Sequence, residues 1–173
     1  MSGASDSVSR MPRRRLEAEA IRDACLAVSG RLDPTAGGPA FTDVTTPRRS
    51  LYLMSARTGA KTSDFGALFD AADCCSIVEA RKESTVAPQA LFLLNDPFVL
   101  DSAEGLAARV AAELPGGDLH ARLERLHGLL FGRVPTTEEI SIAERFLTES
   151  GRGEGWTRLC HLLLCTNEFV HVD

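Results

Sequence analysis

The sequence feature that most constrains the fold is the stretch 84–114, STVAPQALFLLNDPFVLDSAEGLAARVAAEL. It is the longest continuous run of apolar, helix-compatible residues in the chain, yet it contains its own break. Asp96 is a good N-cap and Pro97 suits a first helical position, so the run predicts two consecutive helices that meet at this step. The first of them is apolar all round and is expected to be central and buried, with Ser84 or Thr85 as its N-cap.

Apolar residues recur at helical spacing in four further segments, which are expected to be helices over residues 13–28, 119–131, 136–148 and 156–165. Asp118 and Gly132 delimit the second of these, and Thr136 with Glu139 forms a capping box at the start of the third. Short links between the last three favour antiparallel neighbours. Residues 63–69 are expected to add one or two helical turns, residues 49–54 a short extended segment, and residues 33–47 and 70–83 loops.

These elements predict a mainly α fold. We expect an irregular helical bundle of about six helices, with one short extended segment and a long loop region in the N-terminal half. A chain of 173 residues is about the size of one domain. Residues 13–173 are expected to form it, with the N-terminal helix, loops and central helix pair in 13–114 and a three-helix part in 118–173. Residues 1–12 are expected to be a disordered or truncated lead-in.

The composition excludes several classes of protein. The apolar runs are far shorter than the roughly 20 residues that a membrane helix needs, so no membrane insertion is expected. A net charge of −5 with one Trp and one Tyr argues against nucleic-acid binding. Five cysteines without framework spacing argue against a disulfide scaffold. The opening residues lack the apolar region of a signal peptide, which fits either a cytoplasmic protein or a fragment whose true N-terminus lies upstream.

Cofactor and catalytic motifs are not found. The sequence has no Gly-x-Ser-x-Gly elbow and no His-Glu-x-x-His, so no catalytic residue is assigned. Thr157 stands where a c-type haem motif needs its first cysteine, ahead of Cys160 and His161, so no covalent haem is expected. His161 and Cys165 share a helix face, but two ligands do not make a zinc site. We therefore expect no metal and no cofactor.

The best candidate binding cluster combines polar residues of the N-terminal helix, an arginine pair and the central helix. If these three segments converge, their side chains form a binding site. The alternative is a structural network of ion pairs and helix caps. The residues are Glu19, Arg22, Asp23, Arg48, Arg49, Gln89 and Asn95.

Five blocks of the sequence follow one another in a recognisable order. They are RRRLEAEAIRDACLAVSGRLDPTAGGPAF, RRSLYL, STVAPQALFLLNDPFVLDSAEGLAARV, LFGRVPTTEEISIAERFL and LCHLLLCTNEFVHVD. From about Met11 onward this arrangement resembles the C-terminal part of planctomycete-specific domain one. That is a domain of unknown function in large bacterial proteins, often found with a planctomycete cytochrome c-like domain. The resemblance implies an extracytoplasmic setting and, through neighbouring sulfatase-like proteins, a link to polysaccharide breakdown. It assigns no catalytic residue.

The resemblance and the absence of catalytic motifs together give the functional expectation. We expect a non-catalytic helical interaction or scaffold module of a large bacterial extracytoplasmic protein. Its partners would be upstream domains of the same polypeptide, cytochrome c-like domains among them. The alternative is part of a hydrolytic enzyme acting in polysaccharide breakdown, with further catalytic groups upstream.

Overall fold

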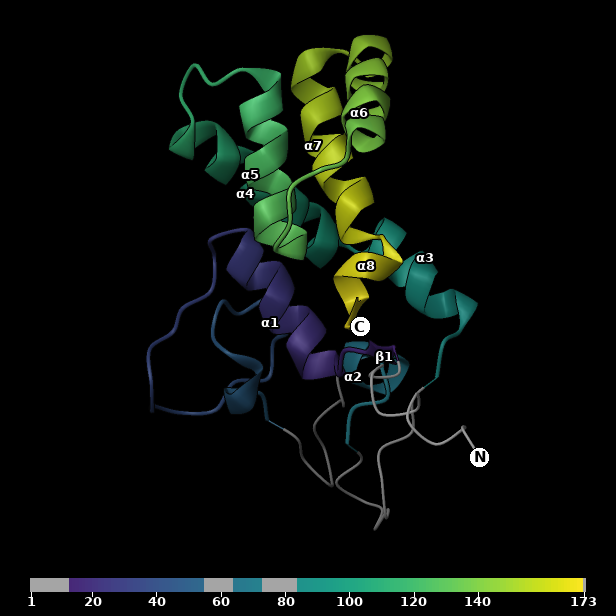
Figure 1. The fold of residues 1–173 in the computed structure, drawn as a ribbon. Coiled ribbons are helices and arrows are strands. Elements are labelled where there is room, and N and C mark those ends of the chain that lie inside the picture. Colours follow the sequence, from purple (N-terminus) through teal and green to yellow (C-terminus); the bar gives the residue numbers. More distant parts are fainter. Residues whose placement is uncertain (1–12, 55–63, 73–83, 173) are drawn as a thin grey trace, which may run out of the picture.

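The computed structural model describes residues 13–54, 64–72 and 84–172, and helices dominate this part of the chain. The prediction of a mainly α, irregular bundle is confirmed, although the described residues alone form eight α-helices instead of about six. In chain order the elements are β1 (Arg14–Arg15), α1 (Ala18–Val28), the 3-10 helix η1 (Ser50–Tyr52), α2 (Asp64–Leu68), α3 (Ala87–Asn95), α4 (Pro97–Glu113), α5 (Leu119–Phe131), α6 (Thr137–Ser150), α7 (Arg152–Leu164), α8 (Asn167–Val170) and β2 (His171–Val172) (Figure 1). The expectation for residues 1–12 falls outside the described residues.

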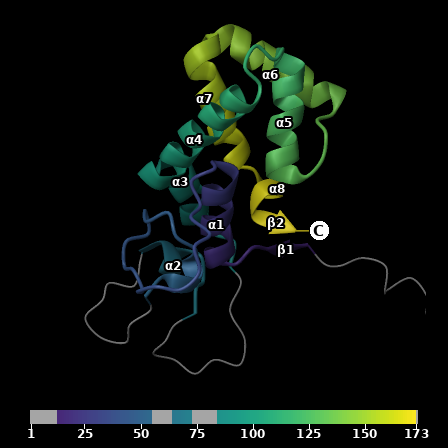
Figure 2. The same cartoon turned by 90° about the vertical axis from the view of Figure 1, so that its left-hand side faces the viewer.

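The centre of the fold is the contact between α4 and α7, the most extensive between any two described elements. Helices α5 and α6 lie beside α7, whereas α1, α2 and the loop that contains η1 gather at the opposite end (Figures 1 and 2). Two apolar clusters fill the interior. The larger one is built mainly from α1, α4 and α7 and includes Leu106, Val110 and Leu164, which are fully buried. The smaller one joins α5, α6 and α7.

The helix caps at Asp96, Asp118, Gly132 and Thr136 lie where the sequence predicts them. Asp96 and Asp118 each accept a backbone N–H from the first turn of the following helix, at 2.9 and 2.8 Å. The capping box of α6 is complete, because Thr136 Oγ1 accepts the Glu139 N–H and Glu139 accepts the Thr136 N–H. Gly132 ends α5 in the left-handed conformation. Each of these predictions depends on local chemistry alone.

The predicted first helix begins later than expected, at Ala18. Arg14 and Arg15 instead form β1, which pairs antiparallel with β2, so that Arg14 lies opposite Val172. The Leu16 N–H continues this pairing with a 2.8 Å hydrogen bond to the Val170 carbonyl. The backbone groups of this segment are therefore used by the far end of the chain and are not available to a helix.

The prediction that α3 is central and buried is wrong. Only Gln89 and Leu93 of this helix are buried, whereas Leu91 and Leu94 are 58% and 44% exposed. Its N-cap is also different from the predicted Ser84 or Thr85. Val86 occupies that position, and the Gln89 side chain accepts the Val86 backbone N–H at 3.2 Å.

Residues 50–52 form the 3-10 helix η1 and not the predicted extended segment. The following residue, Leu53, is extended and makes an isolated parallel bridge with Phe41. Contacts with α1, described below, fix Ser50 and hold this turn in place.

The last predicted helix, over 156–165, begins four residues earlier, at Arg152, and runs through two glycines. A Cβ at Gly155 would come within 3.1 Å of the Ser150 Cβ, so glycine here permits close packing between α6 and α7. Helix α8 and strand β2 follow and were not predicted.

Candidate functional site

Arg22 is the most deeply buried charged side chain among the described residues, with 1% exposure. It extends from α1 into the loop that leads to η1. Its Nε donates to the Val44 carbonyl at 2.8 Å, its Nη1 to the Arg48 carbonyl at 2.8 Å, and its Nη2 to the Thr46 carbonyl. Burial lowers the pKa of the guanidinium from its ordinary value, and the neighbouring Asp23 carboxylate opposes that shift. Arg22 thus satisfies three partly buried loop carbonyls with one side chain.

Asp23 completes this network from the next position on α1. Its Oδ1 accepts the Ser50 N–H at 2.8 Å and the Ser50 hydroxyl at 2.7 Å. The same hydroxyl accepts from Arg22 Nη1 at 3.1 Å. Arg49 contributes a longer ion pair, with its Nε 3.8 Å from Asp23 Oδ2 and its side chain 55% exposed. The structure therefore does bring α1 and the arginine pair together. The polar side chains of α1 in this network mainly hold the loop in place.

The side chain of Arg48 points away from this network toward the glycine turn. Its guanidinium donates to the carbonyls of Gly37 and Pro39 and lies over the Tyr52 ring, 4.3 Å from the ring centroid. The Gly37 N–H donates to the Tyr52 hydroxyl at 2.8 Å. These contacts are intramolecular and shape the loop between α1 and η1.

Glu19 lies beside the network and lines a small cavity of about 80 Å3 together with Arg22 and Ser50. Phe65 and Gly66 of α2 form part of the opposite wall. The volume is enough for a few water molecules and too small for a metabolite.

The structure does not bring Gln89 and Asn95 to this network. Gln89 Nε2 donates to the Leu68 carbonyl at 2.9 Å, which ties α3 to α2. Asn95 Nδ2 donates to the Leu91 carbonyl at 2.8 Å within its own helix. Neither amide therefore takes part in the Arg22 network: Asn95 bonds within its own helix, and Gln89 joins two helices.

A second buried polar cluster was missed by the sequence analysis. Arg15 is 7% exposed and its Nη2 donates to Asp70 Oδ2 at 2.7 Å, while its Nε donates to the Ser84 carbonyl at 3.1 Å. Asp70 Oδ2 also accepts the Ser84 N–H and hydroxyl, at 2.8 and 2.7 Å. The Ser84 hydrogen bonds, with help from Arg15, hold the pKa of Asp70 below its usual range. No local signal marks these three residues, since each is far from the others in sequence.

The cysteines that the structure describes are poor nucleophiles. Burial raises the pKa of Cys25 and of Cys160 to about 12, and that of Cys165 to about 11. A thiol with such a pKa is protonated at neutral pH. His161 Nε2 and Cys165 Sγ both contact the Leu93 carbonyl oxygen, at 2.9 and 3.3 Å, so this pair joins α7 to α3. Among the described residues, no group of three His, Cys, Asp or Glu side chains is placed to hold a metal ion.

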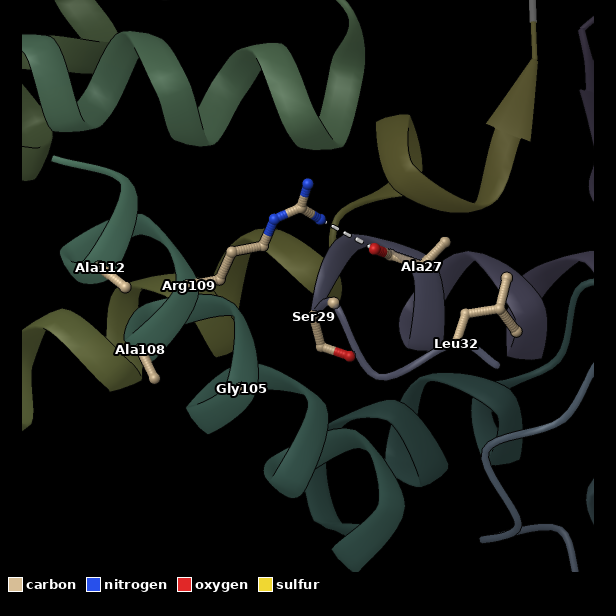
Figure 3. Close-up of a pocket in the computed structure, with 8 residues that line it drawn as sticks. Ala27, Ser29, Leu32, Gly105, Ala108, Arg109 and Ala112 are labelled. Carbon is tan, nitrogen blue, oxygen red and sulfur yellow. Dashed lines mark hydrogen bonds between the residues drawn. The ribbon is translucent and has the colours of Figure 1, made fainter. Parts of the chain in front are cut away.

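Two larger pockets lie outside the polar networks. The first is a shallow groove of about 620 Å3 between the end of α1 and the middle of α4. Figure 3 shows Arg109 extending from α4 toward the Ala27 carbonyl, to which its Nη1 donates at 2.9 Å. Its Nε also pairs with Glu113 at 2.8 Å. A Cβ at Gly105 would come within 3.1 Å of the Ser29 Cβ. Glycine at this position therefore permits the close contact between α4 and the end of α1 beside the groove.

The second pocket has a volume of about 740 Å3 and lies between the start of α5, the end of α6 and the start of α7. Its wall includes Asp118, Arg122, Glu144, Thr148 and Trp156. Two atoms of that wall are buried N–H donors with no hydrogen-bond partner: Arg122 Nε and Trp156 Nε1. Nothing in the sequence pattern links Trp156 with Arg122, which lies 34 residues earlier in the chain.

A family model described as "PSD1: Protein of unknown function (DUF1553)" matches residues 3–147. This match covers most of the chain and ends within α6, so the last sequence block noted above lies beyond it. No curated protein and no solved structure matches the chain. None of the described helices is long and apolar enough to cross a membrane.

Proposed function

We propose that this chain, which belongs to the PSD1 family of proteins of unknown function (DUF1553), is a non-catalytic helical module that binds another protein domain. The observation that carries the proposal is the exposed apolar face of α3. Ala87, Ala90, Leu91 and Leu94 share this face at helical spacing, and all four are exposed. Apolar side chains gathered on one exposed helix face are typical of a protein interaction site.

The other face of α3 is firmly anchored, which makes the exposed face a preformed surface. Phe92 packs against Phe65 and Phe69 of the α2 region, with ring centroids 5.3 and 5.8 Å apart. Leu93 is buried, and its carbonyl is the acceptor shared by His161 and Cys165. A helix that is already ordered loses little conformational entropy when it binds a partner.

The partner proposed is another domain of the same polypeptide. The resemblance to planctomycete-specific domain one supports a cytochrome c-like domain in this role, in an extracytoplasmic protein of a planctomycete. A partner within the same polypeptide is present at a high effective concentration, so a surface of a few apolar side chains is sufficient for association.

The use of Arg22 and Asp23 supports a non-catalytic role over the hydrolytic alternative. Their hydrogen bonds go to loop carbonyls and to Ser50, which leaves them positioned as structural groups. Substitution of Arg22 would release the loop, so a loss of activity after that change would not by itself identify a catalytic residue. A test of the proposal should therefore act on the surface of α3.

The experiment replaces Leu91 and Leu94 together by Asp and measures binding to the separately produced preceding domains by isothermal titration calorimetry. We expect at least about a tenfold loss of affinity, which corresponds to about 1.4 kcal/mol, because two apolar contacts are removed. The matched control is Ile142→Asp, at a residue that is 50% exposed on α6 and should leave the affinity unchanged. Equal affinity of the α3 variant and the original chain, with an unchanged melting temperature, would refute the proposal.

A further inference from the structure

The wall of the pocket between α5, α6 and α7 contains an unusual pair of atoms. Arg122 Nε and Trp156 Nε1 are both buried, and neither has a hydrogen-bond acceptor. Buried N–H donors in folded proteins are nearly always paired, because an unpaired donor loses its hydrogen bonds to water without replacement. Both residues line the pocket and are only half-buried as whole side chains, although the two N–H atoms themselves are buried.

From this arrangement we infer that the pocket is a binding site for a neutral, polyhydroxylated small molecule, a polyol or sugar. The volume of about 740 Å3 lies within the range of small-molecule sites. On binding, the side chains of Arg122 and Trp156 would turn so that their two unpaired N–H groups face the ligand. The wall also supplies acceptors, because Glu144 presents a carboxylate and the Thr148 hydroxyl, which donates to the Glu144 carbonyl at 2.8 Å, retains its lone pairs. A hydroxyl group both donates and accepts hydrogen bonds, so the hydroxyls of one ligand can pair with both the donors and the acceptors of this wall.

The charges of the wall disfavour an anionic ligand. Asp118 and Glu144 are acidic and Arg122 is the single base among the residues that line the pocket. The guanidinium is also unsuited to grip a carboxylate with two parallel hydrogen bonds, since its Nη2 donates to the Leu114 carbonyl at 3.4 Å. The unpaired Nε N–H suits a single hydroxyl oxygen. Leu119 and Leu147 add an apolar surface next to Trp156, against which the carbon-bound hydrogens of a sugar ring can pack.

The site does not depend on the proposed binding surface of α3, because the two share no residue. Failure of one proposal therefore leaves the other unaffected, and different variants test them.

The test uses the fluorescence of Trp156, the one tryptophan in the chain. The full chain is titrated with glucose, sucrose and myo-inositol, and in parallel with acetate and glycine. We expect a saturable fluorescence change with at least one of the three neutral compounds, at a dissociation constant of about 1 mM or lower. Arg122→Met should weaken this binding about tenfold through the loss of one hydrogen bond, whereas Arg145→Met, at an exposed position of α6, should leave it within about twofold.

Thr148→Val is a second variant that removes an acceptor at the pocket rim and is expected to weaken binding in the same direction. Calorimetry on Trp156→Phe measures the contribution of the indole N–H without the fluorophore. Three outcomes would overturn the proposal: no saturable change with any neutral compound, saturation by acetate or glycine alone, or unchanged affinity in Arg122→Met. The first outcome would indicate that ordered water, and not a ligand, pairs with the two donors.

Discussion

The loop between α1 and η1 and the helix pair α4–α7 are attached to the same core by different forces. The loop is held by hydrogen bonds from one buried arginine, which reach three carbonyls within five residues of each other. The helix pair is held by apolar contacts, among them the fully buried Leu106, Val110 and Leu164. One region thus depends on a few directional bonds, and the other on many weak contacts.

The difference shows why an irregular segment can be as well placed as a helix. A helix satisfies its own backbone groups, so its packing needs only an apolar face. A loop leaves carbonyls unpaired, and a guanidinium with five donors can serve several of them at once. The stability of the loop therefore depends on one side chain, Arg22 of α1. Its loss should destabilise the protein more than the loss of any single side chain in the helix pair.

The largest expected effect is that of Arg22→Met. The change removes a buried guanidinium that donates to three loop carbonyls and leaves Asp23 beside an apolar side chain, so we expect a loss of about 3–5 kcal/mol in the free energy of unfolding. Urea denaturation followed by far-UV circular dichroism measures it. Arg49→Met is the matched control, because that arginine is 55% exposed and should cost about 0.5 kcal/mol or less. Similar losses in the two variants would show that burial of Arg22 is not what holds the loop.

A smaller effect is expected from Leu106→Ala in the helix pair. The side chain is fully buried, and truncation should cost about 3 kcal/mol through lost burial and a residual cavity. Hydrogen exchange distinguishes this change from Arg22→Met. Amide protection should fall evenly across α4 and α7 in Leu106→Ala, but first at the Leu53 and Met54 amides in Arg22→Met. An even fall in both variants would contradict the separation of the two regions.

The smallest effect concerns an ion pair within the helical part. Glu139 accepts two hydrogen bonds from Arg133, at 2.7 and 2.9 Å, and these, together with its hydrogen bonds to Thr136, lower its pKa to about 2. A carboxyl whose pKa is depressed by folding stabilises the protein above its unfolded pKa, and this stabilisation is lost as the pH falls from about 4.5 toward 2. The pair is partly exposed, so Glu139→Gln should cost about 1 kcal/mol or less at pH 7.

The pH dependence of Glu139→Gln gives the sharper measurement. Its urea midpoint should decrease less between pH 4.5 and 2 than that of the original chain. Glu138→Gln, in the same turn of α6, should retain the full decrease. If both variants retain it, the Arg133 pair contributes nothing to acid stability.

The sequence-based predictions that proved correct are mostly those with a local cause. The caps at Asp96, Asp118 and Thr136 follow from side chains that bond to the backbone two or three residues away. The predicted start of α7 was too late, because glycines usually interrupt a helix. Here Gly155 instead lies within α7 and permits its close approach to α6. The prediction that α3 is buried was wrong. An apolar sequence shows which residues are hydrophobic, but it does not show how many neighbouring elements cover them.

The candidate site was predictable only in its short-range part. Arg22 and Asp23 are adjacent in sequence and act together, but their main partner Ser50 was not identified. Gln89 and Asn95 bond within or next to their own helix, and nothing in their spacing indicates this. The pairing of Arg15 with Asp70 and Ser84 needs a tertiary contact that no single-sequence pattern encodes.

The pairing of β1 with β2 has a mechanical consequence. Arg14 lies opposite Val172 at the outer end of this short ladder, with Arg15 and His171 next inward. A force that pulls the chain apart from these two sides therefore opens the ladder one residue pair at a time, as in unzipping. The Leu16 hydrogen bond to Val170 follows, and only then does tension reach α1 and α8. The two strands therefore separate before the force acts on the helices.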